Sequence, residues 1–180
     1  MMTPTLRFDI GDIGEIARRY QYPLSETELL ALLKPRINDR GYMTKEELAE
    51  VAYWKAPRSA RHVKRNAEEY VVEVTRFAFG TACERARIQS LTMLDGVLWP
   101  TASVILHLFH REPYQILDFR ALWSVSLDIP AQYSFGYWWP YVQFCRELAE
   151  STGMDMRTLD RALWQYSKEN QREAQQVGAG

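Results

Sequence analysis

Cysteine is scarce in this sequence, which has 180 residues and only two cysteines, Cys83 and Cys145. Two thiols are too few for a four-cysteine zinc site or for the four-thiolate ligation of an iron–sulfur cluster. An excess of one charge is also lacking, because 22 basic residues are balanced by 23 acidic ones, for a formal net charge of −1. This balance excludes a protein that is basic overall, but it leaves a local basic face open.

Long hydrophobic runs are missing as well. The uncharged stretch from Gly96 to His110 contains Pro100 and is shorter than the roughly 20 apolar residues that span a bilayer. Residues 1–10 contain no extended apolar segment of the kind found in secretory signals. We therefore expect a soluble, cytoplasmic protein that has no membrane partner.

Helical spacing of apolar residues is present through most of the chain, and no segment shows a persuasive strand alternation. Capping signals support helices, for example Thr44 followed three residues later by Glu47. Pro35 predicts that one helix ends or kinks just before it. We expect an all-α fold, a compact multi-helix bundle with a single helical domain over residues 1–170. Residues 171–180 lack an apolar stripe and are expected to form a flexible tail.

A tight turn is indicated by the segment Leu94-Asp95-Gly96-Val97-Leu98, and Pro100 and Thr101 follow it as a helix start. The helix that begins there is apolar on all sides, so we expect it to be central and buried. Asp118 lies eighteen residues after Pro100 and directly precedes another short helical pattern.

The turn, the helix start and the spaced aspartate together resemble the helix–hairpin–helix of the DNA base-excision glycosylase superfamily. In that superfamily the hairpin reads roughly Leu-Pro-Gly-Val-Gly, then two variable residues and Thr-Ala, and a catalytic aspartate follows at a fixed distance. The resemblance implies a glycosylase-like fold with a helix–hairpin–helix motif over about residues 82–110. It also implies a monofunctional DNA glycosylase that uses Asp118 as its catalytic carboxylate. Such an enzyme needs no cofactor and acts on double-stranded DNA that contains a damaged or modified base.

Hydrolysis of a glycosidic bond in DNA needs the kind of groups that these two elements offer. Backbone N–H groups of a hairpin, with the positive end of the following helix, can hold a phosphate without reading sequence. The target base must leave the stack and enter a pocket. Bond cleavage leaves positive charge on the sugar, and a nearby carboxylate can stabilise that charge and orient or deprotonate the attacking water.

Two residues depart from the family pattern. Leu98 stands where the hairpin has its second glycine, so either the turn changes or Leu98 adopts a strained left-handed backbone. Pro100 stands where the bifunctional branch carries its Schiff-base lysine, which excludes lyase chemistry by that residue. Branches that only hydrolyse the bond also lack this lysine.

Further candidate site residues follow from their positions. The candidate DNA-binding residues are Gly96, Leu98, Thr101, Lys55 and Arg58. The run from Lys55 to Arg65 holds five Lys or Arg residues and no acid, which suits phosphate contact but equally suits a solvated face.

Two tryptophans near the motif, Trp99 and Trp123, are candidate walls of a base pocket, although core packing also explains Trp123. His107 and His110 stand three residues apart with no third ligand nearby in the sequence. We therefore expect no metal site.

Other interpretations of the same residues remain open. Asp118 before a helix is by itself an ordinary N-cap. A non-catalytic helix–hairpin–helix protein that binds DNA or acts as a scaffold would keep the fold, and Leu98 favours it. An unrelated helical bundle would match by chance, and in that case residues 94–103 would form no hairpin. The sequence does not name the target base, and it leaves the oligomeric state open, with a monomer favoured.

Overall fold

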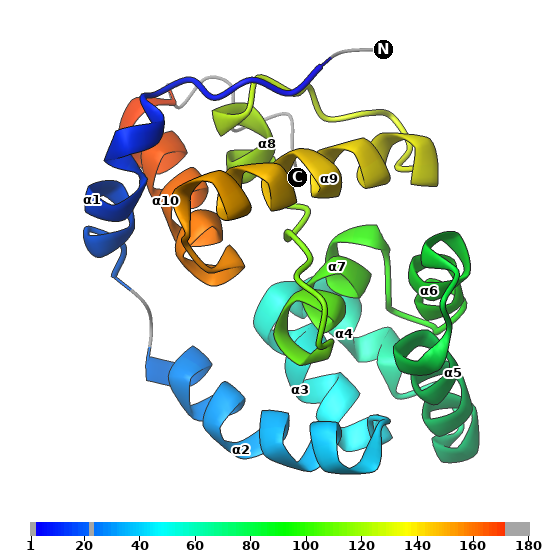
Figure 1. Ribbon diagram of the computed structural model, residues 1–180. Helices are drawn as coiled ribbons and strands as arrows, with labels where there is room; N and C mark the ends of the chain where they lie inside the picture. Colours follow the sequence, from blue (N-terminus) through cyan, green and yellow to red (C-terminus); the bar gives the residue numbers. More distant parts are fainter. Residues whose placement is uncertain (1–2, 22–23, 172–180) are drawn as a thin grey trace. The chain divides into compact units, whose positions relative to one another are not determined.

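The computed structural model describes residues 3–21 and 24–171 (Figure 1). All regular structure within these residues is helical, as the sequence predicts. The elements are η1 (Ile10–Asp12, a 3-10 turn), α1 (Ile13–Arg18), α2 (Leu24–Arg40), α3 (Lys45–Lys55), α4 (Pro57–Val63), α5 (Glu68–Gly80), α6 (Glu84–Leu91), α7 (Trp99–Phe109), α8 (Phe119–Ser124), α9 (Phe135–Thr152) and α10 (Met156–Asn170).

Contacts between the helices divide the chain into two compact units. The central unit comprises residues 22–113 and contains α2 to α7. The terminal unit combines residues 1–21 with residues 114–180 and contains α1, α8, α9 and α10. The single domain over residues 1–170 stays a prediction. Except for Gln171, the expected tail lies outside the described residues.

The central unit is built around α7. Apart from Trp99, Pro100 and His107, every residue of α7 is buried, and the helix packs against α2, α3 and α6. Pro100 lies in the first turn of α7, where a proline removes no intrahelical hydrogen bond. The sequence-based expectation of a central, buried helix is therefore confirmed.

The terminal unit is held together by α10, which packs against α1, α8 and α9. Its core contains the stacked rings of Tyr114 and Trp138, with centroids 5.7 Å apart. A buried carboxylate, Asp160, is satisfied by Gln115 at 2.7 Å and by Arg157 at 2.6 Å. The N-terminal segment joins this unit through backbone hydrogen bonds to the end of α8.

Helix ends follow the local signals in most places. Thr44 and Glu47 form the expected capping box at the start of α3. Gly153 ends α9 in a left-handed conformation, with a φ of 66°. Pro35 does not end α2, which continues to Arg40. Leu33 and Ile37 on either side of it are buried, so packing offsets the lost backbone hydrogen bond.

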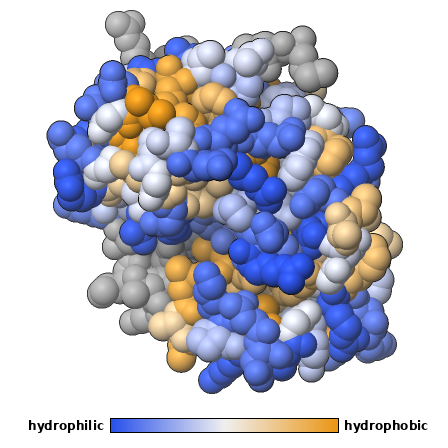
Figure 2. Space-filling view, in the orientation of Figure 1, coloured by the Kyte–Doolittle hydropathy of each residue, from blue (hydrophilic) through white to orange (hydrophobic). Residues whose placement is uncertain are grey.

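No helix in the described part of the chain has both the length and the apolar character needed to cross a membrane. Figure 2 shows one face of the molecule, on which hydrophilic side chains predominate and hydrophobic ones gather in separate patches. Large exposed apolar residues include Phe77 of α5 and two residues between α6 and α7, Met93 and Leu98.

Candidate functional site

The segment between α6 and α7, residues 92–98, forms a tight turn that we call the hairpin turn (Figure 1). The Val97 N–H donates to the Leu94 carbonyl at 3.0 Å and closes the turn. Leu94 and Val97 are buried, so their side chains anchor the turn in the core of the central unit. Two helices joined by a tight turn are therefore present. That they act as the DNA-binding motif of the family stays a prediction.

Gly96 is required by the geometry of the hairpin turn. Its φ is +82°, a conformation that residues with a Cβ rarely adopt. A Cβ built on Gly96 would also lie 2.8 Å from the Val63 nitrogen and 2.9 Å from the Ser59 oxygen, both in α4. The glycine therefore lets the turn approach the backbone of α4 more closely than any other residue would.

Asn66 fixes the hairpin turn from a second direction. This side chain is buried, with an exposed fraction of 5%. Its Oδ1 accepts the Asp95 N–H at 2.9 Å, and its Nδ2 donates to the Asp95 carbonyl at 3.0 Å and to the Val63 carbonyl at 2.9 Å. Both backbone groups of Asp95 are thus satisfied by one residue. Sequence reasoning missed Asn66, because no local pattern links it to residue 95.

Leu98 differs from both the family pattern and one sequence-based expectation. Its φ of −95° and ψ of 174° are extended, so the alternative of a strained left-handed backbone is wrong. It is the N-cap of α7 and its side chain is 65% exposed. Thr101, another candidate DNA-binding residue, is buried, so its side chain contributes to packing in this structure.

The basic run covers the end of α3, the whole of α4 and the two residues that follow. Lys55 is half-buried at the end of α3, whereas Arg58 is exposed on α4. Among the described residues, Arg58, Lys64 and Arg65 make no ion pair. Arg58 directly precedes Ser59 in α4, and the Ser59 carbonyl lies close to Gly96. The side chains of neighbouring helical residues point about 100° apart, so the contact at Ser59 does not place the Arg58 side chain at the hairpin turn.

Asp118 belongs to the terminal unit, whereas the hairpin turn belongs to the central unit. It is the N-cap of α8, and its Oδ1 accepts the Arg120 N–H at 3.0 Å. The capping interpretation is therefore confirmed. The side chain is half-buried, and the hydrogen bond fixes its orientation. A catalytic role stays a prediction.

The charge of Asp118 influences two tyrosines of the terminal unit, Tyr133 and Tyr141. Burial raises the pKa of Tyr133, and the negative charge of Asp118 raises it further. The ring of Tyr133 meets that of Tyr137 edge to face, with centroids 5.8 Å apart. Burial likewise raises the pKa of Tyr137 and of the fully buried Tyr141. These phenols are neutral at pH 7, so they bring no competing negative charge near Asp118.

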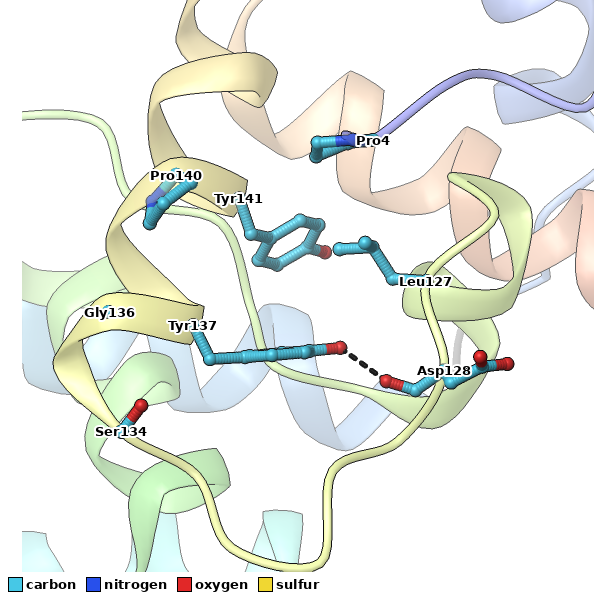
Figure 3. Close-up of a pocket in the computed structure, with 8 residues that line it drawn as sticks. All are labelled: Pro4, Leu127, Asp128, Ser134, Gly136, Tyr137, Pro140 and Tyr141. Atoms are coloured by element: carbon cyan, nitrogen blue, oxygen red, sulfur yellow. Dashed lines mark hydrogen bonds between the residues drawn. The ribbon is translucent and has the colours of Figure 1, made fainter. Parts of the chain in front are cut away.

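A pocket of about 340 Å³ lies beside these tyrosines in the terminal unit. Figure 3 shows the rings of Tyr137 and Tyr141 extending from α9 toward Asp128 and Leu127, and the Tyr137 hydroxyl donates to the Asp128 carbonyl at 2.7 Å. The other residues that line this pocket are Pro4, Ser134, Gly136 and Pro140. Sequence reasoning missed this pocket, because its walls come from distant segments.

The two candidate pocket tryptophans lie in different units. Trp123 stacks on Tyr166 with centroids 6.0 Å apart, and the Arg7 guanidinium lies 4.7 Å from its ring. These contacts support the packing interpretation of Trp123. Trp99 is half-buried at the start of α7 in the central unit.

His107 lies near the end of α7, and His110 is the C-cap of that helix. Nε2 of His110 lies 2.7 Å from Nη1 of Arg87, which also donates to the Ala78 carbonyl. Burial lowers the pKa of His110, and the charge of Arg87 lowers it further. Within the described residues, no three His, Cys, Asp or Glu side chains are grouped so that they could hold a metal ion.

The central unit thus contains a turn held by Gly96 and Asn66, and the terminal unit contains an N-cap carboxylate, Asp118. No family model, no curated protein and no solved structure matches this chain.

Proposed function

We propose that this chain is a monofunctional DNA glycosylase, which flips a damaged or modified base from duplex DNA and hydrolyses its N-glycosidic bond. The observation that carries the proposal is the combination of a turn that requires Gly96 with an oriented N-cap carboxylate, Asp118, at the family's spacing. In this proposal each compact unit supplies one part of the machinery.

The central unit supplies DNA binding in this proposal. The N-terminus of α7 carries a partial positive charge, and Arg58 of α4 is an exposed cation without an ion-pair partner among the described residues. Contacts of this kind hold the phosphate backbone and do not depend on base sequence. They suit an enzyme that must search undamaged DNA for a rare target.

The terminal unit supplies the chemistry. Cleavage of the bond between base and sugar develops positive charge on the sugar, and the Asp118 carboxylate stabilises it. The same carboxylate orients or deprotonates the attacking water. Its hydrogen bond from the Arg120 N–H holds it in one orientation before substrate arrives. The aromatic surroundings formed by Tyr133 and Tyr137 offer flat surfaces for a base.

A non-catalytic DNA-binding or scaffolding protein is the second candidate. Two observations favour it. Leu98 replaces a hairpin glycine, and the capping bond to Arg120 already accounts for Asp118. The second candidate predicts duplex binding without release of any base.

The test is incubation of the purified protein with duplexes that carry a panel of damaged and hypermodified bases. Free base is measured by mass spectrometry, and abasic sites by alkaline strand cleavage. We expect release of one class of base by the wild type and much slower release by Asp118→Asn. Binding without release across the panel would support the second candidate, and absence of binding would contradict both.

A further inference from the structure

Two consecutive helices of the central unit, α3 and α4 (labelled in Figure 1), enclose a groove of about 490 Å³ that we call the α3–α4 groove. The residues that line it are Glu46, Ala49, Glu50 and Tyr53 of α3, with Pro57, Ala60 and Arg61 of α4 and Lys64 directly after it. Both sets follow helical spacing, so each set lies on one face of its helix. Gly96 of the hairpin turn lies against Ser59 and Val63, which belong to neither set. The groove is therefore separate from the hairpin turn.

The α3–α4 groove presents an aromatic side chain that the described part of the chain leaves uncovered. Tyr53 is 68% exposed, and among the described residues its ring packs on no other ring and its hydroxyl forms no hydrogen bond. The other helix contributes Pro57 and Ala60, which offer apolar surface without a long side chain. Tyrosine is enriched in the buried centre of protein–protein interfaces, so this face suits contact with another protein chain.

The two rims of the groove carry opposite charges that do not neutralise each other. Glu46 and Glu50 are exposed on α3 and form an acidic rim. Arg61 and Lys64 are exposed on the α4 side and form a basic rim. In the described part of the chain none of these four side chains forms an ion pair. A complementary partner therefore carries bases opposite α3 and acids opposite α4.

A second copy of this chain carries these charges in the required order. A twofold rotation about an axis parallel to the groove places the acidic rim of each copy opposite the basic rim of the other. Because the single residue Ala56 links the two helices, Tyr53 and Pro57 lie near the linked end of the groove. The charged residues of both rims lie farther from that end, so opposite rims of two copies meet at the same level.

We propose that the α3–α4 groove is a self-association surface, on which a second copy of this chain docks with twofold symmetry. The acidic rim of each copy faces the basic rim of the other, and each Tyr53 packs across the interface on Pro57 and Ala60. A twofold contact uses the same groove on both copies, so it closes as a dimer and does not extend into a filament. This inference departs from the monomer that the sequence favours. It does not rest on the proposed function, because no DNA contact enters it.

The test is sedimentation velocity of the purified full chain over a range of concentrations. A contact between two helix pairs is at the small end of specific interfaces, so we expect a monomer–dimer equilibrium with a dissociation constant of about 1–100 μM. Tyr53→Ala should raise this constant at least about tenfold, because the central aromatic contact is lost. Phe77→Ala, which removes a side chain that is 50% exposed on α5 in the same unit, should leave the constant unchanged.

Charge reversal tests whether opposite rims meet. The acid-reversed variant carries Glu46→Lys and Glu50→Lys, and the base-reversed variant carries Arg61→Glu and Lys64→Glu. Alone, each variant places like charges across the interface, so its dissociation constant should rise at least about tenfold. An equal mixture places acids opposite bases on both sides, so it should dimerise within about threefold of the wild-type constant. This recovery also shows that both variants are folded.

Glu69→Lys is the control for charge reversal, because Glu69 is an exposed acid in the first turn of α5, as Glu46 is in α3. It should dimerise as the wild type does. A wild-type chain that stays monomeric at every concentration would overturn the proposal, whatever its activity on DNA. Reversed variants that dimerise as tightly as the wild type would overturn it as well, since the contact would lie elsewhere. Reversed variants that stay monomeric when mixed would contradict the pairing of the rims.

Discussion

At the scale of single residues, Gly96 tolerates the least change in the hairpin turn. Gly96→Ala places a methyl group at a positive φ and within 2.9 Å of α4 backbone atoms. We expect it to lower the free energy of unfolding by about 2–5 kcal/mol, from backbone strain and overpacking together. Urea unfolding measures this loss.

Gly80→Ala is the matched control for this substitution. Nothing lies within 4 Å of a Cβ at Gly80, the last residue of α5. We expect its effect to be within about 1 kcal/mol. Equal losses in the two variants would contradict the close contact between the turn and α4.

A second residue, His110, should make stability depend on pH. Its pKa is lowered by burial and by Arg87, against smaller opposite effects of Glu84 and of the Phe79 and Glu112 backbone. Below the ordinary histidine pKa of about 6.5 the unfolded chain therefore binds more protons than the folded one. The free energy of unfolding should fall as the pH drops from about 7 to about 5.5.

His110→Gln removes this titration and keeps a polar side chain beside Arg87. Urea unfolding at several pH values should then show a weaker decline than in the wild type. His107→Gln is the control, because His107 lies in α7 and His110 is the C-cap of that helix. An unchanged decline in His110→Gln would show that another group causes it.

At the scale of elements, the proposed function assigns the electrostatic part of DNA binding to α4. Arg58→Ala should reduce the slope of log affinity against log salt by about one, because one phosphate contact is lost. Arg36→Ala is the control, since Arg36 is an exposed arginine of α2 without an ion-pair partner among the described residues. Equal slopes in the wild type and Arg58→Ala would exclude Arg58 from the phosphate contacts.

Elements with strong local signals could be predicted from the sequence. Apolar residues on all sides of α7, the Thr44 capping box and Gly153 each act within a few neighbouring residues. The continuation of α2 past Pro35 could not be predicted, because it depends on the burial of flanking residues in the folded unit.

Residues of the candidate site could be predicted only where the backbone at that position demands a particular residue type. The positive φ at Gly96 demands a glycine, and the start of α8 favours a capping residue such as Asp118. No such demand exists at Asn66, because its partner lies 29 residues away. The extended backbone of Leu98 also follows from the way the whole turn is held, so the family pattern alone left two alternatives open.

At the scale of the whole molecule, the N-terminal segment completes the terminal unit. The Thr5 N–H donates to the Val125 carbonyl at 3.0 Å, and Arg19 pairs with Glu169 at 3.0 Å. Local periodicity carries no information about partners so far apart in the chain. The division into two units therefore emerges only from the structure, and the glycosylase proposal assigns binding to one unit and chemistry to the other.

The central claim is that Asp118 is a catalytic carboxylate in addition to a helix cap. Asn caps helices about as well as Asp, so Asp118→Asn removes the charge and keeps the cap. Asp155→Asn is the matched control, because Asp155 caps α10 in the same unit through the Thr158 N–H at 2.9 Å.

The measurement is the single-turnover rate of base release from the duplex that the wild type cleaves. We expect Asp118→Asn to lose about 10²–10⁴-fold, since general acid–base and electrostatic stabilisation are removed together. Asp155→Asn should stay within about twofold of the wild-type rate, because a retained cap leaves the unit folded. A wild-type rate in Asp118→Asn would contradict the account and leave Asp118 as a helix cap alone.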